Sequence, residues 1–155
     1  MRTRTSARWL LVPFVAMALG TVLAACGGGG GSSLSKADFL KQADAICARL
    51  DKQSQADYQK VIPANTTTKP ADATLVKALG IIIGGIRQEA DGIDGLKEPS
   101  SMSSQVKGML TDLRSGADKA EKAGAAAFAD NAPDYFATAA KDAKDLGLKV
   151  CGQGG

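Results

Sequence analysis

The chain has 155 residues, with 19 lysines and arginines against 16 aspartates and glutamates, three cysteines and no histidine. Arg2, Arg4 and Arg8 precede the first acidic residue, so the surplus of +3 lies entirely in the opening segment. The remainder is formally neutral, which argues against a nucleic-acid partner because nucleic-acid binders present a basic surface. The absence of histidine removes the commonest general base and metal ligand. This length predicts one domain.

Residues 1–25 have the pattern of an export signal. A positively charged start is followed by an apolar run from Trp9 to Ala25, after which the chain changes abruptly to glycine. A charged start, a short apolar stretch and small residues before a cleavage point are typical of secretory signals. An ordinary signal peptide with a coincidental Cys26 and an uncleaved anchor helix are the two alternatives.

Leu23-Ala24-Ala25-Cys26 resembles the lipobox of bacterial lipoproteins at all four positions. The resemblance implies that Cys26 receives diacylglycerol and becomes the mature N-terminus after cleavage. Two or more acyl chains anchor a protein stably, whereas one chain gives marginal binding. We therefore expect an exported protein held at the outer face of the cytoplasmic membrane, in the cell envelope. Residues 26–34 form a Gly/Ser-rich tether, and residues 35–155 form the folded domain.

The first half of this domain predicts two helices, because apolar residues recur at helical spacing. Ser35 and Asp38 predict a capping box at the start of the first helix, and Pro63 limits that helix near residue 62. Pro70 is expected in the first turn of the second helix, which Pro99 stops. The second helix has an apolar face with steps of four, three, four, seven and three residues: Leu75, Leu79, Ile82, Ile86, Ile93 and Leu96.

The second half predicts two more helices. The third opens at residues 100–101 and bends around Gly124. Asn131 is the expected N-cap of the fourth, with Pro133 in its first turn and Gly147 as the left-handed residue at its end. We expect an all-α, up-down four-helix bundle. The first two helices are expected to supply most of the large side chains of the core. The third and fourth helices are rich in alanine, which buries little area.

Cys47 and Cys151 are the two cysteines that remain when Cys26 is assigned to lipid. Export implies an oxidising compartment, so we expect a structural disulfide from the first helix to the C-terminal segment. In an up-down bundle the fourth helix lies against the first, which brings the two cysteines within reach. The alternative is a redox-active pair, although such pairs are usually closely spaced, as in Cys-x-x-Cys.

Two segments of the domain are similar to a known group of proteins. They are SKADFLKQADAIC at residues 35–47 and LGLKVCG at residues 146–152. Both resemble small exported actinobacterial helical proteins, which are often lipoproteins and have no established biochemical function. The resemblance implies a helical fold with paired cysteines and transfers no active site.

Three glycines surround three successive isoleucines at residues 80–85. Each helical glycine costs about 1 kcal/mol relative to alanine, so the cluster needs a reason. Gly80 and Gly84 share a face that permits close approach of another helix; packing inside the bundle, a bend beside a ligand pocket and a partner contact are the alternatives. At least one isoleucine should be partly exposed, because three in succession cannot all point inward. The candidate contact residues are Gly80, Ile81, Ile82, Gly84 and Ile86.

Other candidate sites have weaker support. Asp91 and Asp94 superficially suggest a calcium loop, but that loop needs oxygen ligands at alternate positions and a distal glutamate. The serines at residues 100–104 have no histidine to activate them. Thr66–Thr68 are candidates for O-linked sugar, but an exposed polar linker is the preferred interpretation. We therefore expect no enzyme, no metal and no cofactor.

Two functional hypotheses follow. The first is a membrane-tethered, non-enzymatic helical module that binds an envelope protein, lipid or polymer. The second is a carrier or sensor that holds a small apolar ligand between the helices. An apolar cavity lined by Ile82, Ile86, Met109 and Phe136 would favour the second hypothesis. A solid core with an exposed patch at residues 81–83 would favour the first.

Overall fold

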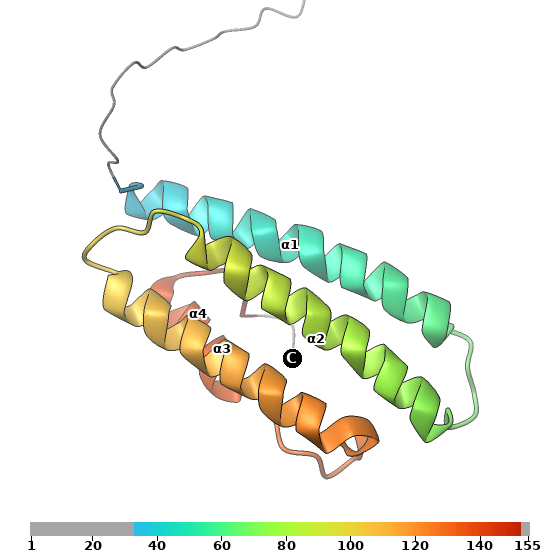
Figure 1. Cartoon of the computed structure of the whole chain (residues 1–155). Coiled ribbons are helices and arrows are strands. Elements are labelled where there is room, and N and C mark those ends of the chain that lie inside the picture. Colours follow the sequence, from blue (N-terminus) through green and yellow to red (C-terminus); the bar gives the residue numbers. More distant parts are fainter. Residues whose placement is uncertain (1–32, 153–155) are drawn as a thin grey trace, which may run out of the picture. The chain divides into compact units, whose positions relative to one another are not determined.

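The computed structural model describes residues 33–152, which form four antiparallel α-helices and one 3₁₀ helix (Figure 1). The elements are α1 (Lys36–Val61), α2 (Asp72–Asp94), α3 (Ser103–Ala123), η1 (Gly124–Phe128) and α4 (Ala137–Leu146). Each α-helix packs on the next in chain order. The predicted all-α, up-down bundle is confirmed. The predicted export signal, Cys26 and the tether through residue 32 lie outside the described residues.

The start of α1 follows the sequence prediction. The hydroxyl of Ser35 accepts a hydrogen bond from the backbone N–H of Asp38 at 3.1 Å and donates one to the Asp38 carboxylate at 2.6 Å. The backbone N–H of Leu34 donates to the carbonyl of Lys97 at 2.8 Å, which fixes the entry of α1 beside the end of α2. None of the helices in residues 33–152 combines the length and the apolar character needed to cross a membrane.

The predicted starts of α2 and α3 need correction. Pro70 lies before the N-cap residue Ala71 rather than in the first turn, and α2 begins at Asp72. Residues 100–101 form a turn, and α3 begins at Ser103. The N-cap residue of α3 is Met102, whose side chain is buried in the core. Burial of this large apolar side chain therefore fixes the start of α3 in place of a serine cap.

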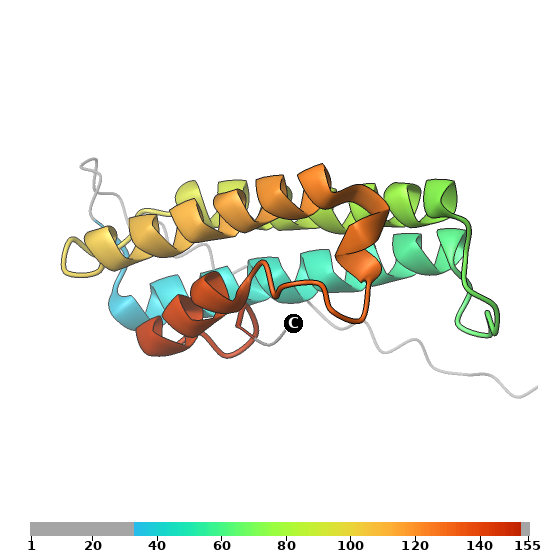
Figure 2. The ribbon, with the colours of Figure 1, turned by 90° about the horizontal axis from the view of Figure 1, so that it is seen from below.

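The predicted start of α4 is also wrong, because Asn131 lies in an irregular connection and α4 begins only at Ala137 (Figure 2). Within this connection, the Asp134 carboxylate accepts a hydrogen bond from the backbone N–H of Phe136 at 3.0 Å. The same stretch passes so close to α3 that a Cβ atom on Gly116 would overlap the carbonyl oxygen of Tyr135. This tertiary contact outweighs the local helix-start signals.

Gly147 ends α4 as predicted, with a positive φ angle of 100°. Gly124, where the sequence predicts a bend, ends α3 with a φ angle of 59°. After Gly147, the backbone N–H of Leu148 donates to the carbonyl of Ala143 at 2.9 Å, and the Leu148 side chain is buried. This is the arrangement expected of a left-handed helix end with an apolar residue after it. Leu148 therefore brings the C-terminal tail, residues 147–152, back onto the bundle.

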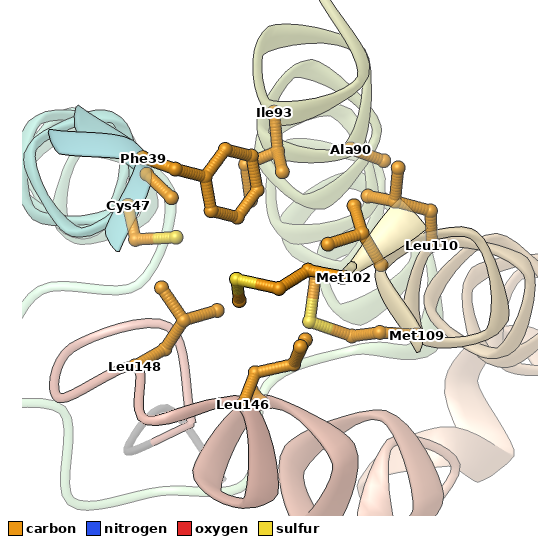
Figure 3. Packing of buried hydrophobic residues seen from close by; sticks show 12 residues of the cluster. Phe39, Cys47, Ala90, Ile93, Met102, Met109, Leu110, Leu146 and Leu148 are labelled. Carbon is orange, nitrogen blue, oxygen red and sulfur yellow. The ribbon is translucent and has the colours of Figure 1, made fainter. Parts of the chain in front are cut away.

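Side chains from all four helices and the C-terminal tail meet in the main core (Figure 3). Met102 and Met109 point toward Phe39 and Ile93, while Leu146 and Leu148 close the core from the opposite side. A second cluster comprises Leu79, Ile83, Ala117 and Ala120, with Phe128, Tyr135 and Phe136 packed against it. The buried residues of α4 are mostly small, namely Ala139, Ala143 and Leu146, as the sequence predicts.

The predicted disulfide between Cys47 and Cys151 is confirmed, with Cα atoms 5.3 Å apart across 104 residues of sequence. The close backbone contact with α1 comes from the C-terminal tail rather than from α4 itself, which differs from the expected helix pairing. The Asp44 carboxylate reinforces this contact, because it accepts hydrogen bonds from the backbone N–H groups of Lys149 and Val150.

Candidate functional site

A partly open cavity of about 130 Å³ lies where the helices and the C-terminal tail meet. Isoleucines of α2 and the side chains of Met109 and Leu113 on α3 form one wall. Phe136 and three alanines of α4 form the opposite wall, and the disulfide lies beside them. The apolar lining residues are Ile82, Ile86, Ile93, Met109, Leu113, Phe136, Ala139, Ala140, Ala143 and Val150. An apolar cavity of about 150 Å³ is known to stay dry and to admit benzene, so this volume suits a small ring or a short alkyl group.

The short side chains of α4 explain why the space exists. Ala139, Ala140 and Ala143 all line the cavity, and none of them reaches toward α2. Protein interiors normally fill such space to crystal-like density. Phe136 is held over one side by the close approach of its backbone to Gly116, where a Cβ would lie 2.9 Å from the Phe136 ring. The cavity is therefore a consequence of small residues on α4 and of one glycine on α3.

Polar groups gather along one side of the cavity. Asp51 and Ser54 of α1 and Glu89 of α2 all line it. Burial raises the pKa of Glu89 to about 8, and the negative charge of Asp51 and a hydrogen bond with that residue contribute to the rise. At neutral pH the Glu89 carboxyl is therefore mostly protonated. The site combines an apolar interior with two neighbouring carboxyl groups.

No lysine or arginine is among the residues that line this cavity within the described chain. Arg87 pairs instead with Asp118 and Glu121, at 2.8 and 2.7 Å. Arg114 pairs with Asp91 and Asp94, both at 3.0 Å. These exposed ion pairs link α2 to α3. Asp91 and Asp94, which superficially suggest a calcium loop in the sequence, therefore bind Arg114 instead.

The candidate residues of the Gly/Ile segment separate into two groups. Ile82 and Ile86 line the cavity, whereas Gly80, Ile81 and Gly84 lie in a different groove between α1 and α2. A Cβ atom added at Gly80 or at Gly84 would meet nothing within 4 Å. The predicted close approach is instead at Gly85, where an added Cβ would lie 3.2 Å from the Cβ of Ser54.

The three isoleucines differ in exposure. Ile83 is only 1% exposed, and Ile81 and Ile82 are half-buried. The prediction that at least one of them is partly exposed is confirmed. They do not form an exposed patch, and the one exposed large apolar side chain in the described part of the chain is Val76, at 51%.

Asp51, Ser54 and Glu89 line the cavity but are not among the site residues predicted from the sequence. The signal for Glu89 is the step of seven between Ile86 and Ile93 on the apolar face of α2, because Glu89 occupies the vacant helical position. On α1, Cys47, Asp51 and Ser54 follow at intervals of four and three, which places them on one face.

No protein-family model matches the sequence, and comparisons with curated proteins and with solved structures give no match either. The fold defines a small, disulfide-linked helical domain with a partly open, mostly apolar cavity.

Proposed function

We propose that this protein is an exported, membrane-anchored binding protein that holds a small apolar ligand between its helices and does not catalyse a reaction. The observation that supports this function best is the cavity, because Ile82, Ile86, Met109 and Phe136 line it together. A concave, mostly apolar space with a few convergent polar groups is the usual form of a small-molecule site.

The ligand gains binding free energy by leaving water. Burial of apolar surface contributes about 25 cal/mol per Å², and the side chains of the cavity supply apolar contacts on several sides. The isoleucines stand on long helices that pack against each other along the bundle. The site is therefore largely formed before a ligand enters, which lowers the ordering cost of binding.

The location we propose rests on the sequence before residue 33 and on the disulfide. The export pattern and the lipobox-like Leu23–Cys26 indicate secretion with a lipid anchor. A stable structural disulfide fits an oxidising compartment. A Gly/Ser-rich tether of nine residue steps is expected to span about 17 Å, so the domain stays near the lipid headgroups. Such a position suits a protein that exchanges small apolar molecules with the membrane.

Binding of an envelope protein or polymer through the isoleucines has less support. Ile83 belongs to the buried core, and Ile81 and Ile82 are half-buried. An exposed apolar patch, which that hypothesis requires, is therefore not formed by residues 81–83.

A titration with benzyl alcohol tests the proposed function. In the full-length protein labelled with ¹³C at the methionine methyl groups, the Met109 methyl lies at the cavity, whereas Met102 is buried outside it. We expect a saturable shift of the Met109 signal and a much smaller shift for Met102. Ala140→Leu fills the cavity and should abolish the response. Ala137→Leu, at an exposed position of the same helix, is the matched control and should retain it. Equal binding in both variants, or no response of Met109, would contradict the proposal.

A further inference from the structure

We propose that the cavity takes a small organic cation, with the apolar body of the ligand among the α2 isoleucines and its ammonium group between Asp51 and Glu89. This inference rests on the proposed function and specifies the chemistry of the ligand. It follows from the combination of a partly open, mostly apolar cavity with two carboxyl groups at the same site.

The carboxyl groups come from two different helices and face the same space. Asp51 lies on α1, one turn from Ser54, and Glu89 lies on α2 between the levels of Ile86 and Ile93. The rest of the lining is apolar except for Ser54. A bound molecule therefore meets carbon over most of its surface and oxygen at one end. This distribution matches an amphiphile with a compact polar head.

The end of the cavity that carries Asp51 and Glu89 is negatively charged. No lysine or arginine is among its lining residues in the described chain. Of the nearby arginines, Arg87 and Arg114 bind other carboxylates on the α2–α3 face. Glu89 is partly buried beside the exposed Asp51, and an opposite charge within about 4–6 Å would favour the ionised form of Glu89. An ammonium group supplies that charge, whereas a carboxylate ligand would add to the repulsion.

The protonation of Glu89 agrees with this assignment. Burial and Asp51 raise the pKa of Glu89 to about 8, and a bound cation would lower it again. Among the residues that line the cavity, Asp51 on α1 is the one other charged group near Glu89. The lining residues of α3, α4 and the C-terminal tail are uncharged. Cation binding should therefore release a proton from Glu89 near neutral pH, and affinity should rise as the pH increases toward 8.

Three ligands of similar size test the inference: benzylammonium, benzyl alcohol and benzoate. A primary ammonium stays charged in this pH range, as lysine does. We expect the Met109 methyl of the full-length protein to respond to benzylammonium at a concentration at least about tenfold lower than to benzyl alcohol at pH 8, a difference equivalent to about 1.4 kcal/mol. Benzoate should give no response. The preference for the cation should decrease at pH 6.

Charge-neutralising variants locate the effect. Asp51→Asn and Glu89→Gln should each weaken benzylammonium binding about tenfold at pH 8, which removes the preference for benzylammonium over benzyl alcohol. Asp130→Asn removes the same charge at an exposed loop position and should change neither affinity. Calorimetry in buffers of different ionisation enthalpy should detect proton release on binding to the native chain and none in Glu89→Gln.

The possible results separate this inference from the proposed function. If benzyl alcohol shifts Met109 and benzylammonium binds no more tightly, the cation assignment is wrong and the apolar site remains. If benzylammonium binds without affecting Met109, its site is elsewhere on the surface and the assignment is again overturned. If Met109 responds to none of the three compounds, both the proposed function and the cation assignment are wrong.

Discussion

The Asp44 carboxylate on α1 accepts a hydrogen bond from the backbone N–H of Val150 at 2.8 Å, across 106 residues of sequence. The same carboxylate also accepts from the backbone N–H of Lys149 at 3.0 Å. The tail that these bonds fix carries Cys151 and Val150, which line the cavity. A single aspartate thus connects the path of the C-terminal tail to the shape of the site.

Asp44→Ala should therefore destabilise the fold. Hydrogen bonds to a charged group are worth about 1.5–3 kcal/mol, and part of this is recovered by water at a partly exposed site. We expect the free energy of unfolding to fall by about 1–2 kcal/mol in urea denaturation. Asp57→Ala, on the same helix, breaks only the exposed pair with Lys60 and should change stability by less than about 0.5 kcal/mol. Equal effects of the two variants would contradict the role of Asp44.

The disulfide should contribute more than any single hydrogen bond. A bond that closes a loop of about 100 residues is worth up to about 4–5 kcal/mol in the chain-entropy model. The double variant Cys47→Ser, Cys151→Ser avoids a free thiol and should melt well below the native protein in non-reducing buffer. Reductant should lower the melting temperature of the native protein and leave the double variant unchanged. A melting temperature that is the same for both proteins would show that the bond is not structural.

The two glycines of α3 form a matched pair for substitution. Gly116→Ala places a methyl group against the Tyr135 carbonyl and the Phe136 ring, and overpacking of this kind costs about 1–3 kcal/mol. At Gly108 an added Cβ meets nothing within 4 Å, so Gly108→Ala should stabilise α3 by about 0.5–1 kcal/mol. Denaturation midpoints should therefore move in opposite directions. Two shifts of the same sign would rule out the close contact at Gly116.

Stability should depend on pH through Glu89. Its pKa is about 8 in the folded chain against a reference value of 4.5, so the folded state holds an extra proton between these values. The stabilising contribution is fully present below about pH 4.5 and is lost as the pH rises through about 8.

Glu89→Gln should remove this dependence and raise the free energy of unfolding at pH 8 by about 1–2 kcal/mol, less than the full linkage value because the side chain is partly exposed. Urea denaturation at pH 5 and pH 8 measures the change, with Asp130→Asn as the control. A native-like pH dependence in Glu89→Gln would contradict the raised pKa.

The lipid anchor can be tested by intact-mass measurement of the protein from membrane fractions. We expect loss of residues 1–25 and acyl chains on Cys26. Cys26→Ser should release the protein from the membrane or leave it with an uncleaved signal. An unmodified Cys26 in the membrane-bound protein would refute the anchor.

Local sequence signals were sufficient for the parts of the fold that local chemistry decides. Ser35 caps α1, Gly147 ends α4, and the cysteine pair closes as expected. They failed at the start of α4, because Asn131 and Pro133 are overruled by the approach of residues 135–136 to Gly116. That contact joins positions about 20 residues apart and leaves no local pattern in the sequence.

The cavity could be predicted only in part. Ile82, Ile86 and Met109 are predictable because they lie on the apolar faces of α2 and α3, and Phe136 because it belongs to the apolar pattern expected of the fourth helix. The acid pair was not, because Asp51 and Glu89 are far apart in sequence and each resembles a surface charge when viewed alone. Glu89 interrupts the apolar face of α2, and such local inconsistencies are expected at functional or strained sites.

The most direct test of the account is a crystal structure of the protein soaked with bromobenzene, using the anomalous signal of bromine to locate the ligand. The account predicts a bromine peak among Ile82, Ile86 and Met109 in the native protein and in Ala137→Leu, and its loss in Ala140→Leu. An empty cavity in the native protein, or bromine bound only at other sites, would contradict the claim that this bundle holds a small apolar ligand between its helices.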